Sequence, residues 1–173
     1  GRPTITAIIE ERTNNGDFHS MQDFITRMAG VINKRTVEHL ILAGAFDTFG
    51  NTRRGMMNVY ERMIDSAVKQ NKDAISGQMS LFDFVSEEDK QSLEMKVPDI
   101  QEFEKEDLLE REKEVLGVYV TGHPLDEYTG MWEKHISARS TDFLIDEETG
   151  QAKLMNGSKQ TIGGLISNIK VIT

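Results

Sequence analysis

The sequence predicts a mainly α-helical chain that ends in a short β segment, and three observations lead to this prediction. Apolar residues recur every three or four positions, as on one face of a long helix, at Met56, Val59, Tyr60, Met63, Ile64 and Ala67. A polar, acidic stretch without such periodicity follows. The last residues are rich in β-branched side chains, and Gly163 and Gly164 among them permit a bend or bulge.

Each helix expected before residue 70 has its own local signals. Residues 4–12 carry isoleucines at helical spacing, and the turn at 14–17 ends that segment. Ser20 and Asn33 have side-chain acceptors suited to cap the next two helices, which are expected to end at Gly30 and Gly44. After a turn at 50–52, the long apolar-faced helix is expected to run to about Lys69.

These patterns divide the chain into four parts. Residues 1–70 are expected to form a compact helical domain, and residues 71–100 an acidic linker. Residues 101–158 are expected to form an α+β connector, with a charged helix at about 102–116, a short helix at about 125–132 and a strand-like run at 143–145. Residues 159–173 are expected to supply one β strand, which needs neighbouring strands to be stable.

Charge is unevenly distributed along the chain. The net charge is −9, but residues 1–72 carry +2, residues 73–150 carry −14 and residues 151–173 carry +3. The acidic middle would repel a nucleic-acid backbone, so any such contact is expected at the ends. There are no cysteines, and no apolar run approaches the ~18 residues of a membrane span. We therefore expect a cytoplasmic protein without membrane contact.

The sequence lacks the patterns of an active site. No two of the histidines have metal-ligand spacing, and the carboxylates at 102–114 and 146–148 are typical of solvated faces. Nucleotide-binding glycine motifs and nucleophile elbows are absent. We expect no catalytic residue, metal ligand, cofactor or small-molecule ligand in this chain. One interpretation is then an acidic helical adaptor that binds other proteins through the 102–114 face and has no nucleic-acid role.

A helix–glycine–helix element points instead to a phosphate contact. Ala43, Gly44 and Ala45 are small residues at the tip of a hairpin, where backbone N–H groups can approach a phosphate closely. Arg53 and Arg54 begin the next helix and would add positive charge for a backbone contact without sequence preference. The alternative is a plain glycine cap with surface arginines, and the local pattern leaves both open.

An apolar island interrupts the polar linker at Gln78, Met79, Ser80, Leu81 and Phe82. Apolar side chains in such a segment either fold back onto their own domain or insert into a partner. An extended peptide of this kind suits a partner with an apolar cleft and a polar rim, the glutamine binding the rim and the leucine and phenylalanine filling the cleft. The pattern alone leaves the two alternatives open.

Four runs, taken together and in order, resemble one family. They are IIEER at 8–12, NKRTVEHLILAGAFD at 33–47, GQMSLF at 77–82 and EKEVLGVYVTGHPL at 112–125. The chain resembles the C-terminal region of the bacterial replicative (C-family) DNA polymerase III alpha subunits, and the matches span nearly its whole length.

The resemblance implies a helix-hairpin-helix domain that binds the sliding clamp (the beta subunit), followed by the start of an OB fold. It implies that residues 78–82 are the internal clamp motif and that the hairpin around Gly44, with Arg53 and Arg54, contacts the duplex DNA backbone. It also implies other replisome subunits as partners of the parent polymerase. In the family, the Mg²⁺-dependent nucleotidyl transfer belongs to upstream parts, so this segment is expected to be non-catalytic.

Overall fold

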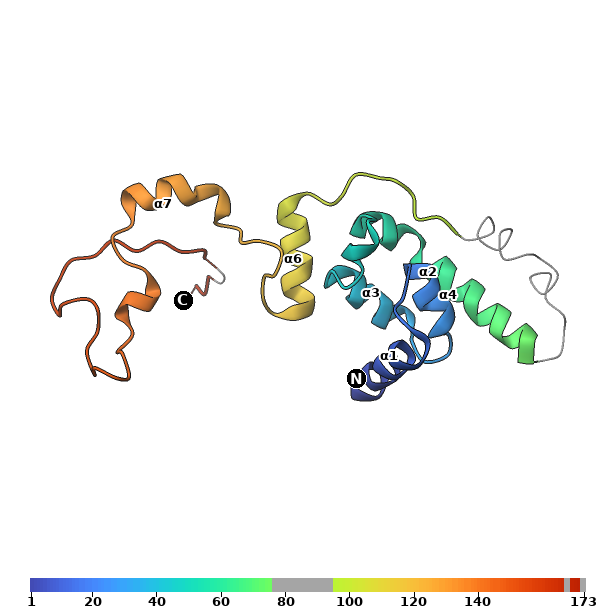
Figure 1. Ribbon diagram of the computed structural model, residues 1–173. Coiled ribbons are helices and arrows are strands. Elements are labelled where there is room, and N and C mark those ends of the chain that lie inside the picture. The colour runs from blue at the N-terminus through green and yellow to red at the C-terminus, as the bar shows by residue number, and fades with distance from the viewer. Residues whose placement is uncertain (76–94, 167–168, 172–173) are drawn as a thin grey trace. The chain divides into compact units, whose positions relative to one another are not determined.

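The computed structural model describes residues 1–75, 95–166 and 169–171, and the chain divides into two compact units, Gly1–Val120 and Thr121–Thr173 (Figure 1). The predicted clamp motif at 78–82 lies outside the described residues. The helices of the first unit are α1 (Arg2–Asn15), α2 (Met21–Arg27), α3 (Lys34–Leu42), the 3-10 helix η1 (Asp47–Phe49), α4 (Arg53–Ile75) and α6 (Lys105–Leu116).

The core of the first unit lies where α2 and α3 pack against α4. Residues of the predicted apolar face of α4 are buried, and Met56 and Met63 are at most 1% exposed. They meet Phe24 and Ile25 of α2 and Val37 of α3 in one apolar cluster. Burying these side chains supplies the main driving force for this unit, and the 3.6-residue period revealed it in the sequence.

The starts of α2 and α3 follow the predicted caps, whereas α2 ends at Arg27, before the predicted end at Gly30. The Ser20 side chain accepts the Asp23 N–H at 3.0 Å, and the Asn33 side chain accepts the Thr36 N–H at 2.9 Å. Gly44 has the left-handed φ of +78° that ends α3, as its position predicted. Helix α4 extends to Ile75, beyond the predicted end near Lys69.

Helix α6 belongs to the first unit and packs against α3 (Figure 1). Leu109 and Glu112 are the residues of α6 that are buried, at 2% and 0% exposure. Residues 101–120 thus group with the helical domain, whereas the residues from 121 onward form a unit of their own. This arrangement brings an acidic segment into direct contact with the predicted hairpin.

The second unit contains η3 (Asp126–Tyr128), α7 (Thr129–His135) and η4 (Ser140–Phe143). No strand forms in its described residues, and their one isolated β-bridge pairs Ile145 with Ala152. The strand-like run predicted at 143–145 is therefore wrong, because the 3-10 helix η4 ends at Phe143 and a lone bridge does not make a strand.

The OB-fold strand predicted for 159–173 is not seen in the described residues 159–166 and 169–171. Thr161 donates its N–H to the Ser137 hydroxyl and accepts the Ser137 N–H, at 2.9 and 3.0 Å. Beyond it, the β-branched side chains remain exposed, and Ile162 and Ile169 are 64% and 76% exposed. A β-rich sequence becomes a strand only when a neighbouring strand pairs with its backbone, and the part of the chain that the structure describes supplies no such strand beside these residues.

Candidate nucleic-acid interface

The hairpin between α3 and α4 is a self-capped turn. The N–H groups of Ala43, Gly44 and Ala45 donate to carbonyl oxygens in the last turns of α3, at 2.9, 3.0 and 2.9 Å. Such bonds satisfy the carbonyls that a helix end leaves free. The prediction that these three N–H groups face a phosphate therefore meets a structural obstacle, because each donor is already used inside the chain.

Arg53 lies inside the unit and not on its surface, with 2% of the residue exposed. Its Nε and Nη2 donate to the two carboxylate oxygens of Asp47 at 2.9 and 2.7 Å. Its Nη1 donates to the Leu42 carbonyl oxygen at 2.9 Å and to Glu112 Oε1 at 3.4 Å. Arg53 as a direct phosphate contact is thus a wrong prediction for this structure, because burial and internal partners leave its guanidinium out of reach.

The partners of Arg53 keep its charge stable in the interior. Hydrogen bonds to Asp47 raise the pKa of the guanidinium above its ordinary value, against the opposite effect of burial. A buried charge without a partner would be strongly unfavourable, whereas a bidentate carboxylate matches the planar fork of arginine. Arg53 therefore ties together α3, the hairpin and α6.

Gly44 of the hairpin lies directly against the Arg53 side chain. A Cβ built on Gly44 would lie 2.8 Å from Arg53 Cζ and 2.8 Å from Asp47 Oδ2. Its φ of +78° is also a conformation that side-chain-bearing residues rarely adopt. Glycine at this position thus serves two purposes, since it forms the turn and leaves room for the buried guanidinium.

A segment that we call the strap, residues 95–104, covers the first turn of α4. The Glu102 carboxylate accepts the backbone N–H groups of Arg53 and Arg54 at 2.6 and 2.9 Å. The Thr52 hydroxyl donates to the Ile100 carbonyl oxygen at 3.0 Å. A Cβ on Gly55 would lie 2.7 Å from the Pro98 carbonyl oxygen, so the strap passes directly over this residue. The strap thereby caps α4 from 49 residues away in sequence.

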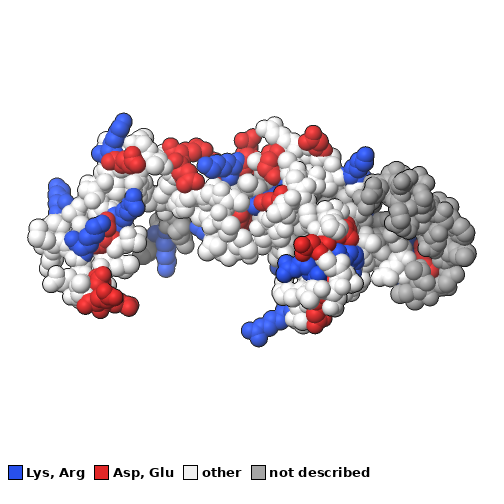
Figure 2. Space-filling model, viewed as in Figure 1, with Lys and Arg blue, Asp and Glu red and all other residues white. Residues whose placement is uncertain are grey.

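Arg54 is exposed, unlike its neighbour Arg53, and its phosphate contact stays a prediction. On the face in Figure 2, the coloured basic and acidic side chains are scattered among uncharged ones, and no broad area of one sign is visible among the described residues. Lys34, for example, is paired with Glu61 and Asp65 at 3.0 and 3.1 Å. Arg54 thus offers an exposed positive charge at the start of α4.

The hairpin also forms one wall of an apolar groove of about 440 Å³ beside α1. Its lining includes Ile5, Ile8 and Arg12 of α1 together with Phe46 and Phe49 of the hairpin. Phe46 and Phe49 stack with ring centroids 5.8 Å apart. These rings pack within the hairpin, and Arg12 is the one positively charged residue among those that line the groove.

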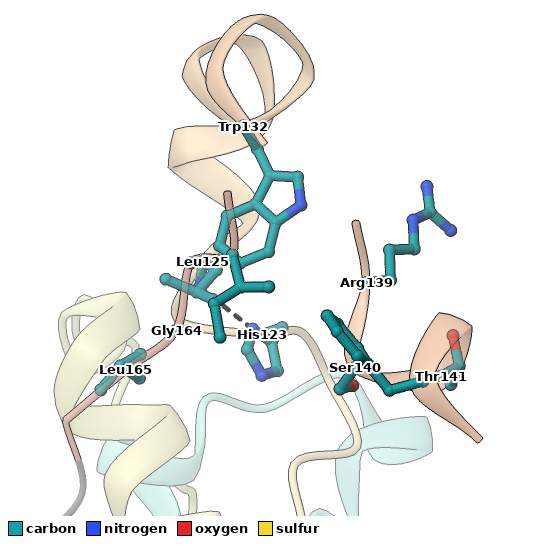
Figure 3. A pocket seen from close by; sticks show the side chains of 11 residues that line it. His123, Leu125, Trp132, Arg139, Ser140, Thr141, Gly164 and Leu165 are labelled. Carbon is teal, nitrogen blue, oxygen red and sulfur yellow. Dashed lines mark hydrogen bonds between the residues drawn. The ribbon is translucent and has the colours of Figure 1, made fainter. Parts of the chain in front are cut away.

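The second unit has a separate pocket of about 710 Å³, lined by residues of α7 and of the segment 162–165 (Figure 3). Trp132 packs tightly on Gly163, where a Cβ would lie 2.8 Å from the indole Cζ3. The His123 Nδ1 accepts the Leu125 N–H at 3.1 Å, shown as the dashed line in Figure 3. The polar lining consists of His123, Arg139, Ser140 and Thr141, so it contains no carboxylate to act with them as a base.

Other features of the described residues bear on the remaining predictions. None of their helices is long and apolar enough to span a membrane, and they contain no cluster of three or more potential metal ligands. The acidic 102–114 face, which the adaptor interpretation would use, is partly internal, because Leu109 and Glu112 are buried and Glu102 caps α4.

Comparison with known proteins agrees with this geometry. A family model described as a helix-hairpin-helix motif matches residues 1–56, which contain α1 to α3, the hairpin and the start of α4. The chain is 35% identical over 164 residues to the DNA polymerase III subunit alpha of Chlamydia pneumoniae, which covers 86% of this chain and 13% of the relative. The corresponding subunit of Vibrio cholerae is 32% identical over 100% of this chain and 14% of its own length.

The chain is homologous to one region of the DNA polymerase III alpha subunits. The alpha subunit of Escherichia coli K12 adds a third match, 34% identical over 87% of this chain. These matches confirm the family resemblance that the four sequence runs indicated. The chain spans about a seventh of the length of these relatives, since 13–14% of each is covered. What a whole alpha subunit does is therefore a matter of proposal for this segment.

Sequence reasoning missed the residues that hold the hairpin in place. Glu102 and Glu112 lie 49 and 59 positions from Arg53 in sequence, within a run of similar acidic residues. Their neighbours Glu104, Glu106 and Glu110 are exposed. No local pattern separates a buried acid from a solvated one here, except that Leu109 and Glu112 share a helix face at i and i+3.

Proposed function

We propose that this chain is a non-catalytic segment of a replicative DNA polymerase alpha subunit. In this proposal it tethers the polymerase to the sliding clamp and contacts the backbone of duplex DNA during chromosomal replication. The observation that carries the proposal is the match to alpha subunits over most of the chain, with a helix-hairpin-helix motif in residues 1–56. The chemistry, with its Mg²⁺, would reside in the rest of the parent polymerase.

The clamp contact is assigned to residues 78–82. These residues form an apolar island, Gln78-Met79-Ser80-Leu81-Phe82, in an otherwise polar segment. A peptide that inserts two adjacent apolar side chains into a cleft can bind specifically with a small surface. A modest contact of this kind raises the local concentration of the polymerase at the primer end, so release from DNA no longer ends synthesis.

A binding measurement with purified sliding clamp tests the tether. The variant with Gln78→Ala, Leu81→Ala and Phe82→Ala is expected to lose clamp binding in calorimetry. A matched control carries three substitutions in the same segment, Ser86→Ala, Glu87→Ala and Glu88→Ala, and is expected to bind as the unaltered chain does. Equal binding by the two triple variants would overturn the assignment.

The DNA contact is assigned to the hairpin at Ala43, Gly44 and Ala45 together with Arg54. The exposed guanidinium of Arg54 supplies charge, and the small hairpin residues allow close approach of a phosphate. In this proposal Arg53 does not touch the DNA. Its hydrogen bonds to Asp47 and Leu42 hold the hairpin in shape. A contact of this kind is sequence-independent and weakens as salt concentration rises.

A further inference from the structure

We propose that the strap, residues 95–104, is an autoinhibitory element that competes with duplex DNA for the start of α4. The inference rests on the proposed DNA contact at the hairpin and specifies how that contact is regulated. In the described state, the strap occupies the N–H groups of Arg53 and Arg54 in the first turn of α4. Duplex DNA engages these two N–H groups once the strap moves away.

The contacts of Glu102 are those that a phosphate would make. Its two carboxylate oxygens accept the backbone N–H groups of Arg53, Arg54 and Phe103, at 2.6, 2.9 and 2.9 Å. A carboxylate and a phosphate have the same charge sign and accept the same donors, so both cannot occupy the first turn of α4. Glu102 is also only half-buried, so solvent and a ligand can approach its edge.

Backbone contacts fix the strap over the same place, independently of Glu102. The Thr52 hydroxyl binds the Ile100 carbonyl oxygen at 3.0 Å, and Gly55 leaves just enough room for the Pro98 carbonyl, which a Cβ would meet at 2.7 Å. Val97 packs against the core cluster. A duplex that approached the start of α4 would therefore collide with the strap as well as with its charge.

The charge distribution also fits competition with DNA. Residues 1–72 carry a net charge of +2, whereas residues 73–150 carry −14. The strap and the first turn of α6 bring Glu102, Glu104, Glu106 and Asp107 into the unit that holds the hairpin. Of these acids, Glu102 binds the positive end of α4, where its carboxylate stabilises the closed state and takes the place that a DNA phosphate would occupy.

Removing the charge of Glu102 tests the inference. Glu102→Gln is expected to tighten binding of the chain to a short fluorescent duplex about five-fold in anisotropy titrations at low salt. Glu104→Gln removes an equal charge two residues away, at an exposed position, and is expected to change affinity by less than about two-fold. The melting temperature of Glu102→Gln should fall below that of the unaltered chain, because α4 loses the side chain that caps it.

Hydrogen exchange reports displacement of the strap directly. Saturating duplex is expected to speed exchange of the Phe103 amide, whose hydrogen bond to Glu102 would be lost, while core amides of α4 stay protected. If the unaltered chain binds duplex but Glu102→Gln binds no tighter than Glu104→Gln, the strap does not compete and only this inference is overturned. If no form of the chain binds duplex, the proposed DNA contact fails and the inference fails with it.

Discussion

Arg53 of α4 and Glu112 of α6 form an ion pair inside the helical unit, with Nη1 and Oε1 3.4 Å apart and side chains 3% and 0% exposed. Glu112 also accepts the Val120 N–H at 2.7 Å. An acidic helix thus holds an arginine that lies 59 positions earlier in the chain, and this arginine in turn supports the hairpin.

Loss of the Glu112 carboxylate should destabilise the helical unit. Glu112→Ala leaves part of the Arg53 charge and the Val120 N–H without their buried acceptor, so the free energy of unfolding is expected to fall by about 3 kcal/mol. Glu110→Ala alters an exposed acid on the same helix and should change it by less than about 0.5 kcal/mol. Urea unfolding followed by circular dichroism measures both, and equal effects would contradict the buried pair.

Two glycines with the same φ separate backbone strain from crowding. Gly44 and Gly50 both have φ +78°, but only Gly44 has Arg53 against it, and a Cβ on Gly50 meets nothing within 4 Å. Gly50→Ala should therefore cost about 1 kcal/mol from backbone strain alone. Gly44→Ala should cost about 2 kcal/mol more, since the guanidinium must move. Thermal unfolding of the two variants measures the difference, and identical values would contradict the close approach.

Charge reversal at Arg54 tests the proposed DNA contact. Arg54→Glu should weaken duplex binding about ten-fold and reduce the slope of log affinity against log salt by about 1. Arg62→Glu makes the same change in net charge at another exposed position of α4, more than two turns away, and serves as the control. An equal loss in both variants would indicate a general charge effect and no local contact.

The single tryptophan reports the packing of the second unit. Gly163→Ala places a Cβ 2.8 Å from Trp132 Cζ3 and 2.9 Å from Ile136 Cδ1, so the indole is expected to shift and its emission to move to longer wavelength. The adjacent Gly164→Ala meets nothing within 4 Å and should leave the spectrum unchanged. Fluorescence spectra measure the emission maximum of both variants. An unchanged maximum in Gly163→Ala would contradict the contact between Gly163 and Trp132.

Acid should loosen the connection between α1 and α2. Arg27 Nε donates to Glu11 Oε1 at 2.9 Å, and this hydrogen bond holds the pKa of Glu11 below its ordinary value of 4.5. Because folding favours the ionised form, Glu11 contributes stability above pH 4.5, and this is lost as pH falls through the lowered folded value.

The matching variant for this pH dependence is Glu11→Gln, which cannot ionise. Its melting temperature should lie below that of the unaltered chain at neutral pH, and the difference should shrink as pH falls below 4.5. Glu10→Gln, at the exposed neighbouring position, is expected to show a smaller difference at every pH. A constant gap between Glu11→Gln and the unaltered chain would contradict the linkage to Glu11.

Local signals in the sequence determined much of the helical unit. The period of Met56, Val59 and Met63 predicted the buried face of α4, and Ser20 and Asn33 predicted the caps of α2 and α3. These features depend on residues a few positions apart, so one segment contains all the information. The same holds for the family runs, which identified the homology to alpha subunits without any structure.

Only the tertiary structure decided the roles of the charged residues around the hairpin. Arg53 and Arg54 are adjacent and chemically identical in the sequence, yet one is buried and the other exposed. The Arg53 guanidinium is held inside by Asp47, Leu42 and Glu112, and Glu112 lies 59 positions away in sequence, whereas Glu102 binds the backbone of both arginines and does not distinguish them. Local sequence also could not predict whether the β-rich residues 159–173 form a strand, because a strand needs a neighbouring strand to pair with. The sequence thus determined which segments are helices, and long-range packing decided which charges face solvent.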